Sequence, residues 1–252
     1  MNKEIALAVI VGTLLAITLP RAYSDYRTYL SYGPGGPPYN PLGWVASRLI
    51  LQPFAKEVFS TTVYERKILA GETASFLSDD TVAARKRDRP VIGPHVVPHR
   101  QLTDWAGDDI KEKLIQRFND LAARNPHLVK LKTSNLEMHG EAIFLADGLE
   151  NAAPVAAQVQ GETAHIHRLK DSSLHVILSP ADCKKLFEAG WAQRQGLSGT
   201  HVPSILTAGK PLNLPAEYVL VYAPRTNEEV DFVMEIVAAS VKYMAGVEKI
   251  VQ

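Results

Sequence analysis

The sequence has no surplus of charge of either sign, and it has a single cysteine. Among its 252 residues, 27 are Lys or Arg and 27 are Asp or Glu, so the formal net charge is zero. Without surplus basic side chains to neutralise phosphates, this is not the composition of a nucleic-acid-binding protein. Cys183 alone cannot form an internal disulfide, and no Asn-x-Ser/Thr glycosylation acceptor occurs. Both absences favour a domain that faces a reducing compartment.

The motifs of several large enzyme classes are also missing. The chain contains no GxSxG nucleophile turn, no Walker phosphate loop, no GxGxxG fingerprint and no HExxH zinc motif. Cys183 falls inside a predicted amphipathic helix, where a thiol is a poor nucleophile. An enzyme with this sequence must therefore use histidine chemistry, a metal or the reactivity of its own substrate.

A long uncharged run stands at the N-terminus. Residues 5–20 read IALAVIVGTLLAITLP, flanked by Lys3 and Arg21. A helix of this length reaches about 24 Å, slightly less than a hydrocarbon core of about 30 Å, and the flanking basic side chains extend its reach. We expect a single-pass transmembrane signal-anchor over 5–20, in the endoplasmic reticulum membrane, with the main domain in the cytosol. A cleaved secretory signal and a buried core helix are the alternatives.

Residues 21–90 read as a juxtamembrane connector. A Gly/Pro cluster at 33–38 breaks regular structure, and the apolar segment 42–59 (LGWVASRLILQPFAKEVF) follows it. That segment is predicted either to lie in the membrane interface as a helix or to pack on the main domain. The basic run AARKRDRP at 83–90 is interpreted as a solvated linker, with attraction to anionic lipid as the alternative.

The main domain is predicted over 91–252. Apolar residues at helical spacing indicate a helix over 104–124, Ser179-Pro180 begins a second helix that Gly190 ends, and a capping box at Thr226 begins the last. Alternating or apolar runs predict strands over 128–133, 141–146, 161–168, 173–179 and 217–223. Because the strands come mostly together, we predict an α+β fold, with a mostly antiparallel sheet covered by helices on one face.

Three histidines stand out in the predicted hairpin. His165 and His167 are two apart on one strand and share a face. If the two strands pair with an even residue sum, His175 joins that face; an odd sum places it on the other. Three imidazoles at one point suit proton transfer near neutrality, a zinc or iron ion, or hydrogen bonds to an anion. The alternative is a set of structural histidines satisfied within the sheet.

Further residues are candidates for the same site. His139 precedes the 141–146 strand, and His95 and His99 lie where the chain enters the main domain. Arg194, just past a helix end, has the fork to hold an enolate or carboxylate, although a solvated Arg is the default. The remaining candidate ligand-binding residues, which are as easily structural, are Trp191, Tyr222 and Arg225.

The ordered sequence of these motifs resembles that of the fungal luciferases, a family with many non-luminous members. The resemblance rests on segments spread over most of the chain: a membrane helix followed by 25–30 (DYRTYL), Arg89-Pro90 with His95, 136–139 (LEMH) with 142–145 (AIFL), Glu162 with 164–167 (AHIH), 173–175 (SLH), 190–194 (GWAQR) and 222–225 (YAPR).

This resemblance implies an activity. Luminous members oxidise 3-hydroxyhispidin, a styryl-pyrone enol, with molecular oxygen as co-substrate, forming a cyclic peroxide that loses carbon dioxide. It implies no organic or metal cofactor; any metal would bind at His165, His167 and His175. By the same resemblance, His165, His167, His175 and His139 are base or anion-binding candidates, Glu162 or Asp171 orients an imidazole, and Arg194 holds the pyrone oxygens.

Two segments depart from the pattern of the luminous members. Gln195-Gly196 replaces a His-Pro pair, and the Pro-interrupted stretch 204–216 is longer. These departures favour a non-luminous homologue acting on another polyketide-type enol. The same residues also fit a metal-dependent enzyme or a membrane-tethered binding module without catalysis. The sequence predicts no oligomeric state.

Overall fold

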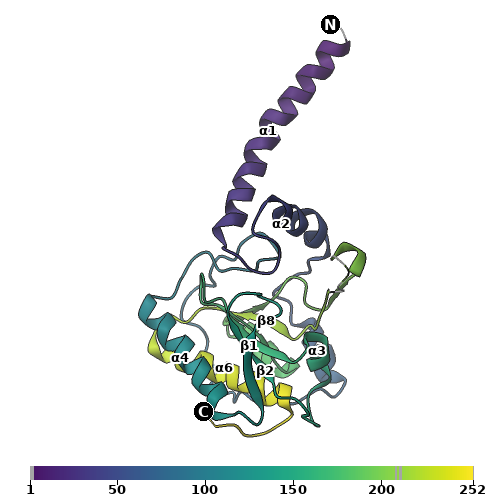
Figure 1. Cartoon of the computed structure of the whole chain (residues 1–252). Coiled ribbons are helices and arrows are strands. Elements are labelled where there is room, and N and C mark those ends of the chain that lie inside the picture. The colour runs from purple at the N-terminus through teal and green to yellow at the C-terminus, as the bar shows by residue number, and fades with distance from the viewer. Residues whose placement is uncertain (1–2, 208, 210–211, 252) are drawn as a thin grey trace.

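A computed structural model describes residues 3–207, 209 and 212–251, and it has the predicted α+β architecture. A long helix, α1 (Lys3–Ser31), projects from a body built on one sheet (Figure 1). The sheet has the strand order β1-β2-β3-β4-β8-β5, and all its neighbours are antiparallel. Its strands are β1 (Val129–Thr133), β2 (Glu141–Leu145), β3 (Glu162–Ile166), β4 (Leu174–Ile177), β5 (Ala192–Arg194) and β8 (Tyr218–Val221).

Helices cover one face of this sheet, as the sequence predicts. The last helix, α6 (Asn227–Ala245), packs on β2, β3 and β4, and α4 (Asp108–Arg124) lies beside it (Figure 1). The Thr226 side chain caps α6 by accepting a hydrogen bond from the Glu229 N–H. Valines of α6 share one core with Val176 and Val219, which are buried on the helix-covered face of the sheet. Burial of this apolar face holds the helices to the sheet.

Short helices and extended chain complete the body. The segment predicted as an apolar helix over 42–59 forms α2 (Pro41–Val45), a π-helical turn (Ala46–Leu51) and a 3₁₀ turn (Gln52–Phe54). Next come α3 (Thr62–Leu69) and, later in the chain, α5 (Pro180–Glu188), which pack on each other. The smaller elements are 3₁₀ turns at Pro154–Val159 and Ser204–Leu206 and a two-stranded sheet of β6 (Thr200–Val202) and β7 (Leu212–Leu214).

The foot of α1 is tied to the body through one carboxylate. Asp25 accepts a hydrogen bond from the indole N–H of Trp44 at 2.7 Å and pairs with Arg48 at 3.1 Å. It also accepts from Nε2 of His95 at 3.1 Å, while the Tyr32 hydroxyl contacts His95 Nδ1 at 2.9 Å. Because a carboxylate only accepts, Nε2 carries the proton and Nδ1 accepts from the tyrosine. The helix is thus joined to the α2 region and to the loop that holds His95.

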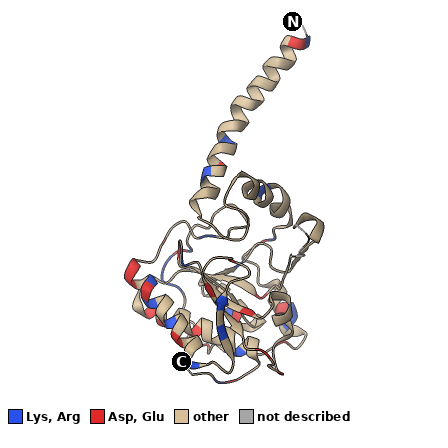
Figure 2. Ribbon diagram, viewed as in Figure 1, with Lys and Arg blue, Asp and Glu red and all other residues tan. Residues whose placement is uncertain are grey.

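The charges are distributed unevenly between α1 and the body. Between Glu4 and Arg21 the helix bears no charged side chain, whereas both signs are mixed over the body (Figure 2). Among the described residues, α1 is the single helix long and apolar enough to cross a membrane, with a mean hydropathy of 2.0. Length and composition alone fit a membrane span or a signal sequence equally.

Asp182 binds residues 75–77, which precede the main domain, and so allows a test of how this segment is fixed to the body. This buried carboxylate accepts hydrogen bonds from the Phe76 and Leu77 N–H groups and from the Ser75 and Ser179 hydroxyls. We expect Asp182→Ala to lower the free energy of unfolding by about 3 kcal/mol, because buried donors lose their acceptor. Denaturant unfolding in detergent measures it. The exposed Asp80→Ala is the control, and equal stabilities of the two variants would contradict this account.

Candidate active site

The strand register brings the three histidines together. In the β3–β4 pair His165 lies opposite His175, so both share a face, and His167 shares it by alternation. The ring centroids of His165 and His175 are 5.3 Å apart, those of His167 and His175 are 5.0 Å apart, and those of His165 and His167 are 5.5 Å apart. The even register left open by the sequence is therefore the one that forms. All three side chains are almost completely buried.

Each of the three rings is held through its Nδ1 atom. His165 Nδ1 lies 2.7 Å from Glu162 Oε1, and His175 Nδ1 lies 3.2 Å from the Val219 carbonyl oxygen. His167 Nδ1 lies 2.9 Å from the Ser173 hydroxyl, whose own hydrogen goes to Asp171. All three partners therefore accept, so each Nδ1 donates its proton. In neutral rings this leaves a lone pair on every Nε2.

Glu162 is ionised and firmly placed. Besides His165, it accepts hydrogen bonds from the Ser134 hydroxyl at 2.6 Å and the Asn135 N–H at 2.7 Å. Burial on its own raises the pKa of Glu162, but the hydrogen bonds from His165, Ser134 and Asn135 outweigh it and hold the pKa below its ordinary value. An ionised carboxylate behind His165 fixes the orientation of that ring and favours a positive charge on it.

The neighbouring imidazoles are neutral. Burial lowers the pKa of His167 and of His175 well below the ordinary range, and the nearby histidines lower it further. Arg100 adds to this effect at His167. Burial raises the pKa of Asp171, which stands behind Ser173 and His167. The cluster thus presents uncharged imidazoles at neutral pH, the form that accepts protons or hydrogen bonds.

Two further rings extend the cluster: His99, which the sequence placed only at the entry to the main domain, and Tyr218, which it did not single out. His99 stacks on His175 at a centroid distance of 5.4 Å, and Tyr218 stacks on His175 at 4.5 Å. Nδ1 of His99 is buried and has no hydrogen-bond partner within the described residues. Tyr218 lies two residues before Leu220 on β8, so the two side chains share a face. Because Leu220 pairs with His175, Tyr218 lies on the histidine face as well. His99 belongs to a distant segment without regular secondary structure, so no strand register predicts where its side chain lies.

The buried cation beside the histidines is Arg100. Its guanidinium pairs with Glu137 at 2.5 Å and donates to the Pro34 carbonyl at 3.1 Å. Glu137 Oε2 lies 3.9 Å from Nε2 of His167. Burial raises the pKa of Glu137 although Arg100 opposes the shift. The Arg100–Glu137 pair borders the cluster, and neither residue was among the sequence candidates.

The structure corrects the expectations for Arg194 and His139. Arg194 pairs with Val219 and so points to the sheet face opposite His175, where it donates to the carbonyls of Glu57 and Ser60. It holds the chain before α3 and does not reach the histidines. His139 is exposed in the turn before β2, where Met138 and Gly140 have positive φ angles. That turn carries the imidazole away from the sheet face.

The other candidate residues lie around the cluster or at the surface. Tyr222 donates to Gln193, whose amide lies 3.5 Å from His99, so it is two contacts from the histidines. The Trp191 indole donates to the Ala83 carbonyl and packs on Phe232. Arg225 is bound to Asp104 at the surface, and its N–H donates to Glu229. Neither Trp191 nor Arg225 contacts the cluster.

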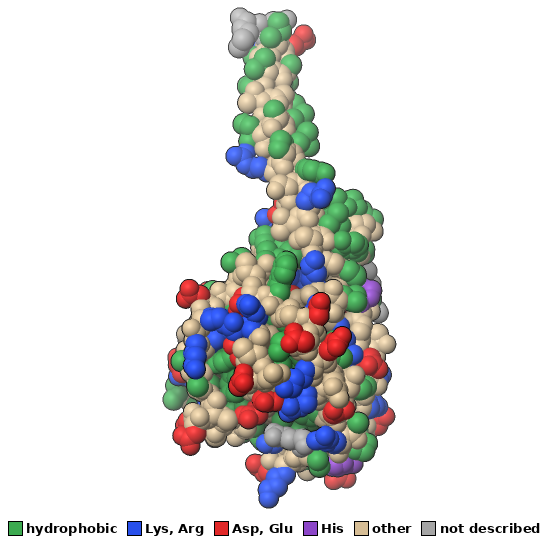
Figure 3. Space-filling view, turned by 90° about the vertical axis from the view of Figure 1, so that its left-hand side faces the viewer, with side chains coloured by type: hydrophobic (Ala, Val, Ile, Leu, Met, Phe, Trp, Pro, Cys, Tyr) green, Lys and Arg blue, Asp and Glu red, His purple; other side chains and the backbone are tan. Residues whose placement is uncertain are grey.

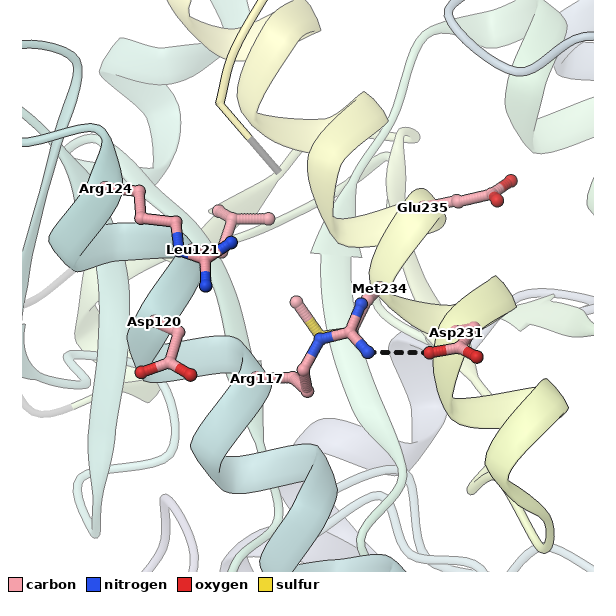
Figure 4. A pocket seen from close by; sticks show the side chains of 7 residues that line it. All are labelled: Arg117, Asp120, Leu121, Arg124, Asp231, Met234 and Glu235. Atoms are coloured by element: carbon pink, nitrogen blue, oxygen red, sulfur yellow. Dashed lines mark hydrogen bonds and ion pairs between the residues drawn. The ribbon is translucent and has the colours of Figure 1, made fainter.

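A cavity of about 320 Å³ leads toward the histidines. His99 and Gln193 line it together with His95, Phe59, Gln52 and Gly196. It therefore reaches the ring that stacks on His175. A smaller hollow of about 100 Å³ lies between α4 and α6 (Figure 4). There Arg117 and Asp231 form an ion pair of 2.7 Å. That hollow belongs to the helical layer, on the side of the sheet away from the histidines.

Comparison with known proteins agrees with this arrangement. The pattern of the Luciferase domain family matches residues 160–240, the stretch with all three histidines. The chain is 32% identical to the luciferase of Neonothopanus nambi over 97% of this chain and 89% of that protein. It is 31% identical to the luciferase of Armillaria ostoyae, over 97% and 90% of the two chains.

The chain belongs to the fungal luciferase family. Similarity to the luciferase of Armillaria mellea, at 32% identity over 95% of this chain and 86% of that protein, points the same way. No solved structure matches the chain.

The two departures from the pattern of luminous members fall at different places. Gln195 and Gly196 are buried, and Gly196 lines the cavity. The described part of the 204–216 stretch includes the 3₁₀ turn Ser204–Leu206 and β7, both outside the main sheet, and residues 208, 210 and 211 are not described.

The titration of His99 gives a test of this buried cluster. Burial lowers its pKa from 6.5 to about 4, so the unfolded chain binds a proton in this range and the folded chain does not. Stability therefore falls as the pH drops from 6.5 to 4, by about 3 kcal/mol for this residue. We expect the free energy of unfolding of His99→Asn to fall by about 3 kcal/mol less than that of the unaltered protein over this pH range. Denaturant unfolding at a series of pH values measures it.

The comparison of His99→Asn with the unaltered protein isolates the contribution of His99 to the pH dependence of stability. The raised pKa values of Asp171 and Glu137 act in the opposite direction, since those carboxyls bind protons more readily when folded. Both groups remain in the variant. Exposed His127→Asn is the control, and it should keep the dependence of the unaltered protein. Parallel pH profiles for His99→Asn and the unaltered protein would contradict a buried neutral His99.

Proposed function

We propose that this chain is an oxygen-using enzyme that converts an enolisable small molecule, such as the pyrone 3-hydroxyhispidin, at the cluster of His165, His167 and His175. The observation that carries the proposal is the convergence of three buried imidazoles with their Nδ1 atoms engaged. Membership of the fungal luciferase family supports the reaction class. Native substrates in this proposal include other polyketide enols of secondary metabolism.

His165 is the proposed proton acceptor. Its Nδ1–H is bound to ionised Glu162, so Nε2 can take the enol proton while the carboxylate stabilises the resulting imidazolium. The enolate that remains is electron-rich and reacts with molecular oxygen to form a peroxide. Loss of carbon dioxide from a cyclic peroxide balances the reaction: substrate and one oxygen molecule give one carbon dioxide and one oxidised product.

The surroundings of the cluster suit an anionic intermediate. Arg100, only 2% exposed, is the nearest buried cation, and it takes the role that the sequence gave to Arg194. His99 and Tyr218 offer aromatic faces on which a flat pyrone can stack. Burial keeps water from the peroxide. The cavity of about 320 Å³ is at the lower end of the range for small-molecule sites.

We also propose that α1 anchors the enzyme in the endoplasmic reticulum membrane with the body in the cytosol. At 1.5 Å per residue, the uncharged residues 5–20 of this helix reach about 24 Å, and the flanking Lys3 and Arg21 extend that reach toward the width of a bilayer core. Apolar side chains cover α1 and continue onto the body at its foot (Figure 3). There Tyr39, Leu42 and Leu49 are 49%, 75% and 68% exposed, which suits the membrane interface. An apolar substrate in the bilayer would then lie close to the cavity.

Replacement of His165 tests the catalytic proposal. We expect His165→Gln to lower kcat for oxygen uptake with 3-hydroxyhispidin at least 100-fold, since general-base catalysis supplies factors of about 10²–10⁴. Glu162→Gln should lower kcat less, because Nε2 remains. His139→Gln, in the exposed turn, is the matched control. An oxygen electrode measures the rate of oxygen uptake of each variant on a panel of pyrones. Unchanged turnover in His165→Gln would overturn the assignment of His165 as the proton acceptor.

Substitutions in α1 test the membrane proposal. Leu14 and Leu15 are exposed at the middle of the uncharged run. Changing both to Lys should release the protein from membranes on carbonate extraction, since each Lys at a helix centre costs about 3 kcal/mol. The control is Leu69→Lys, an exposed leucine of the body. Intact mass distinguishes the alternatives: a mature chain lacking the first residues would show a cleaved signal in place of an anchor.

A further inference from the structure

The three histidines have the arrangement of a metal-binding site. One ring nitrogen of each lies within 4.8 Å of the ring nitrogens of the other two. Since every Nδ1 is engaged, Nε2 is the nitrogen free to bind a ligand. Nitrogen ligands of zinc lie at 2.0–2.1 Å from the ion, hence about 3.4 Å from each other in a tetrahedral site. Ring rotations that move the nitrogens by about 1 Å close this difference.

The partners of Nδ1 are those of metal-bound histidines. A histidine ligand normally donates its other N–H to a carboxylate, a backbone carbonyl or water, which fixes the ring and strengthens the ligand. Here Glu162 is the carboxylate behind His165 and the Val219 carbonyl is the acceptor behind His175. Ser173, oriented by Asp171, serves His167. Each ring thus has its Nδ1 engaged and its Nε2 available, and the three rings on one sheet face are close enough to share one ligand.

We propose that His165, His167 and His175 bind one divalent transition-metal ion of the iron-to-zinc series through Nε2, with a coordination position open to substrate. Three imidazoles suit zinc, iron and copper, and three protein ligands are the number found in catalytic sites. On the Nε2 side of His167, Glu137 lies 3.9 Å away but is held by Arg100. Cys183 contacts the carbonyls of Leu178 and Glu217 and does not join the three histidines.

The ion would change where the enol proton goes. Water on such an ion ionises near neutrality, so bound hydroxide can remove the proton, leave as water and make room for the enolate oxygen. No electron is transferred in this step, and charge is conserved. His165 then acts as a ligand that Glu162 orients. The inference rests on the proposed function only for the nature of the substrate; metal binding itself needs no substrate.

Cobalt(II) titration tests the site directly. The full chain, purified in detergent and treated with chelator, is titrated with Co²⁺ and followed by its visible absorption. We expect one equivalent to bind, with the intense bands of a four- or five-coordinate ion. His167→Gln should lose these bands, and Glu162→Gln should weaken binding by about 10–100-fold, because it removes the charge behind His165. Exposed His139→Gln is the control and should bind as the unaltered protein does.

The outcomes separate the inference from the proposed function. Thermal melts show whether each variant is folded, and Glu162→Gln keeps an acceptor for the Asn135 N–H. Substoichiometric Co²⁺ binding, or unchanged binding in a folded His167→Gln, would overturn the metal site. Full oxygen uptake on 3-hydroxyhispidin after chelation would overturn it as well while leaving the proposed function intact. Stoichiometric binding without turnover on any pyrone would uphold the metal site and reject the proposed function.

Discussion

The burial of three imidazoles on one face of the sheet is the constraint that shapes this molecule. Polar rings are stable there only if each Nδ1–H has an acceptor. Glu162, the Ser173–Asp171 pair and the Val219 carbonyl provide these acceptors. Those groups in turn fix neighbouring segments, since Glu162 binds the 134–136 turn and Asp171 accepts from the Gln101 N–H. The chain that covers this face is therefore held by the same contacts that orient the histidines.

The two sides of the sheet have different roles because of strand alternation. The helical side is apolar and joins Val176, Val219 and the valines of α6 in one core. The other side carries the histidines, Gln193 and Tyr218, under extended chain in place of helices. That covering chain leads back through His95 and Asp25 to α1 (Figure 1). The foot of α1 is thereby tied, through Asp25 and His95, to the loop that lines the cavity beside His99.

Much of this architecture could be predicted from the sequence, and the failures have identifiable causes. Periodicity found the long helices and five of the six strands of the main sheet, but β5 has three residues, too few for a pattern. On that strand the sequence favoured Arg194, although Gln193 is the residue that faces the histidines. Nothing local shows which of two adjacent residues points inward. Arg100 was missed, and the contact of His99 with His175 could not be predicted, because a distant, irregular segment brings both residues to the sheet.

The central claim is that all three rings donate a proton from Nδ1 and that the neutral rings of His167 and His175 have an Nε2 lone pair available. Nitrogen-15 NMR of the histidine-labelled chain measures charge state and tautomer for every ring. The account predicts that at pH 7 His167 and His175 are neutral Nδ1–H tautomers and that His165 carries a proton on Nδ1. Hispidin-like pyrones added without oxygen should shift the Nε2 resonances of all three and leave those of the exposed His139 and His127 unchanged. A charged ring at His167 or His175, or an Nδ1 without its proton at any of the three positions, would contradict it.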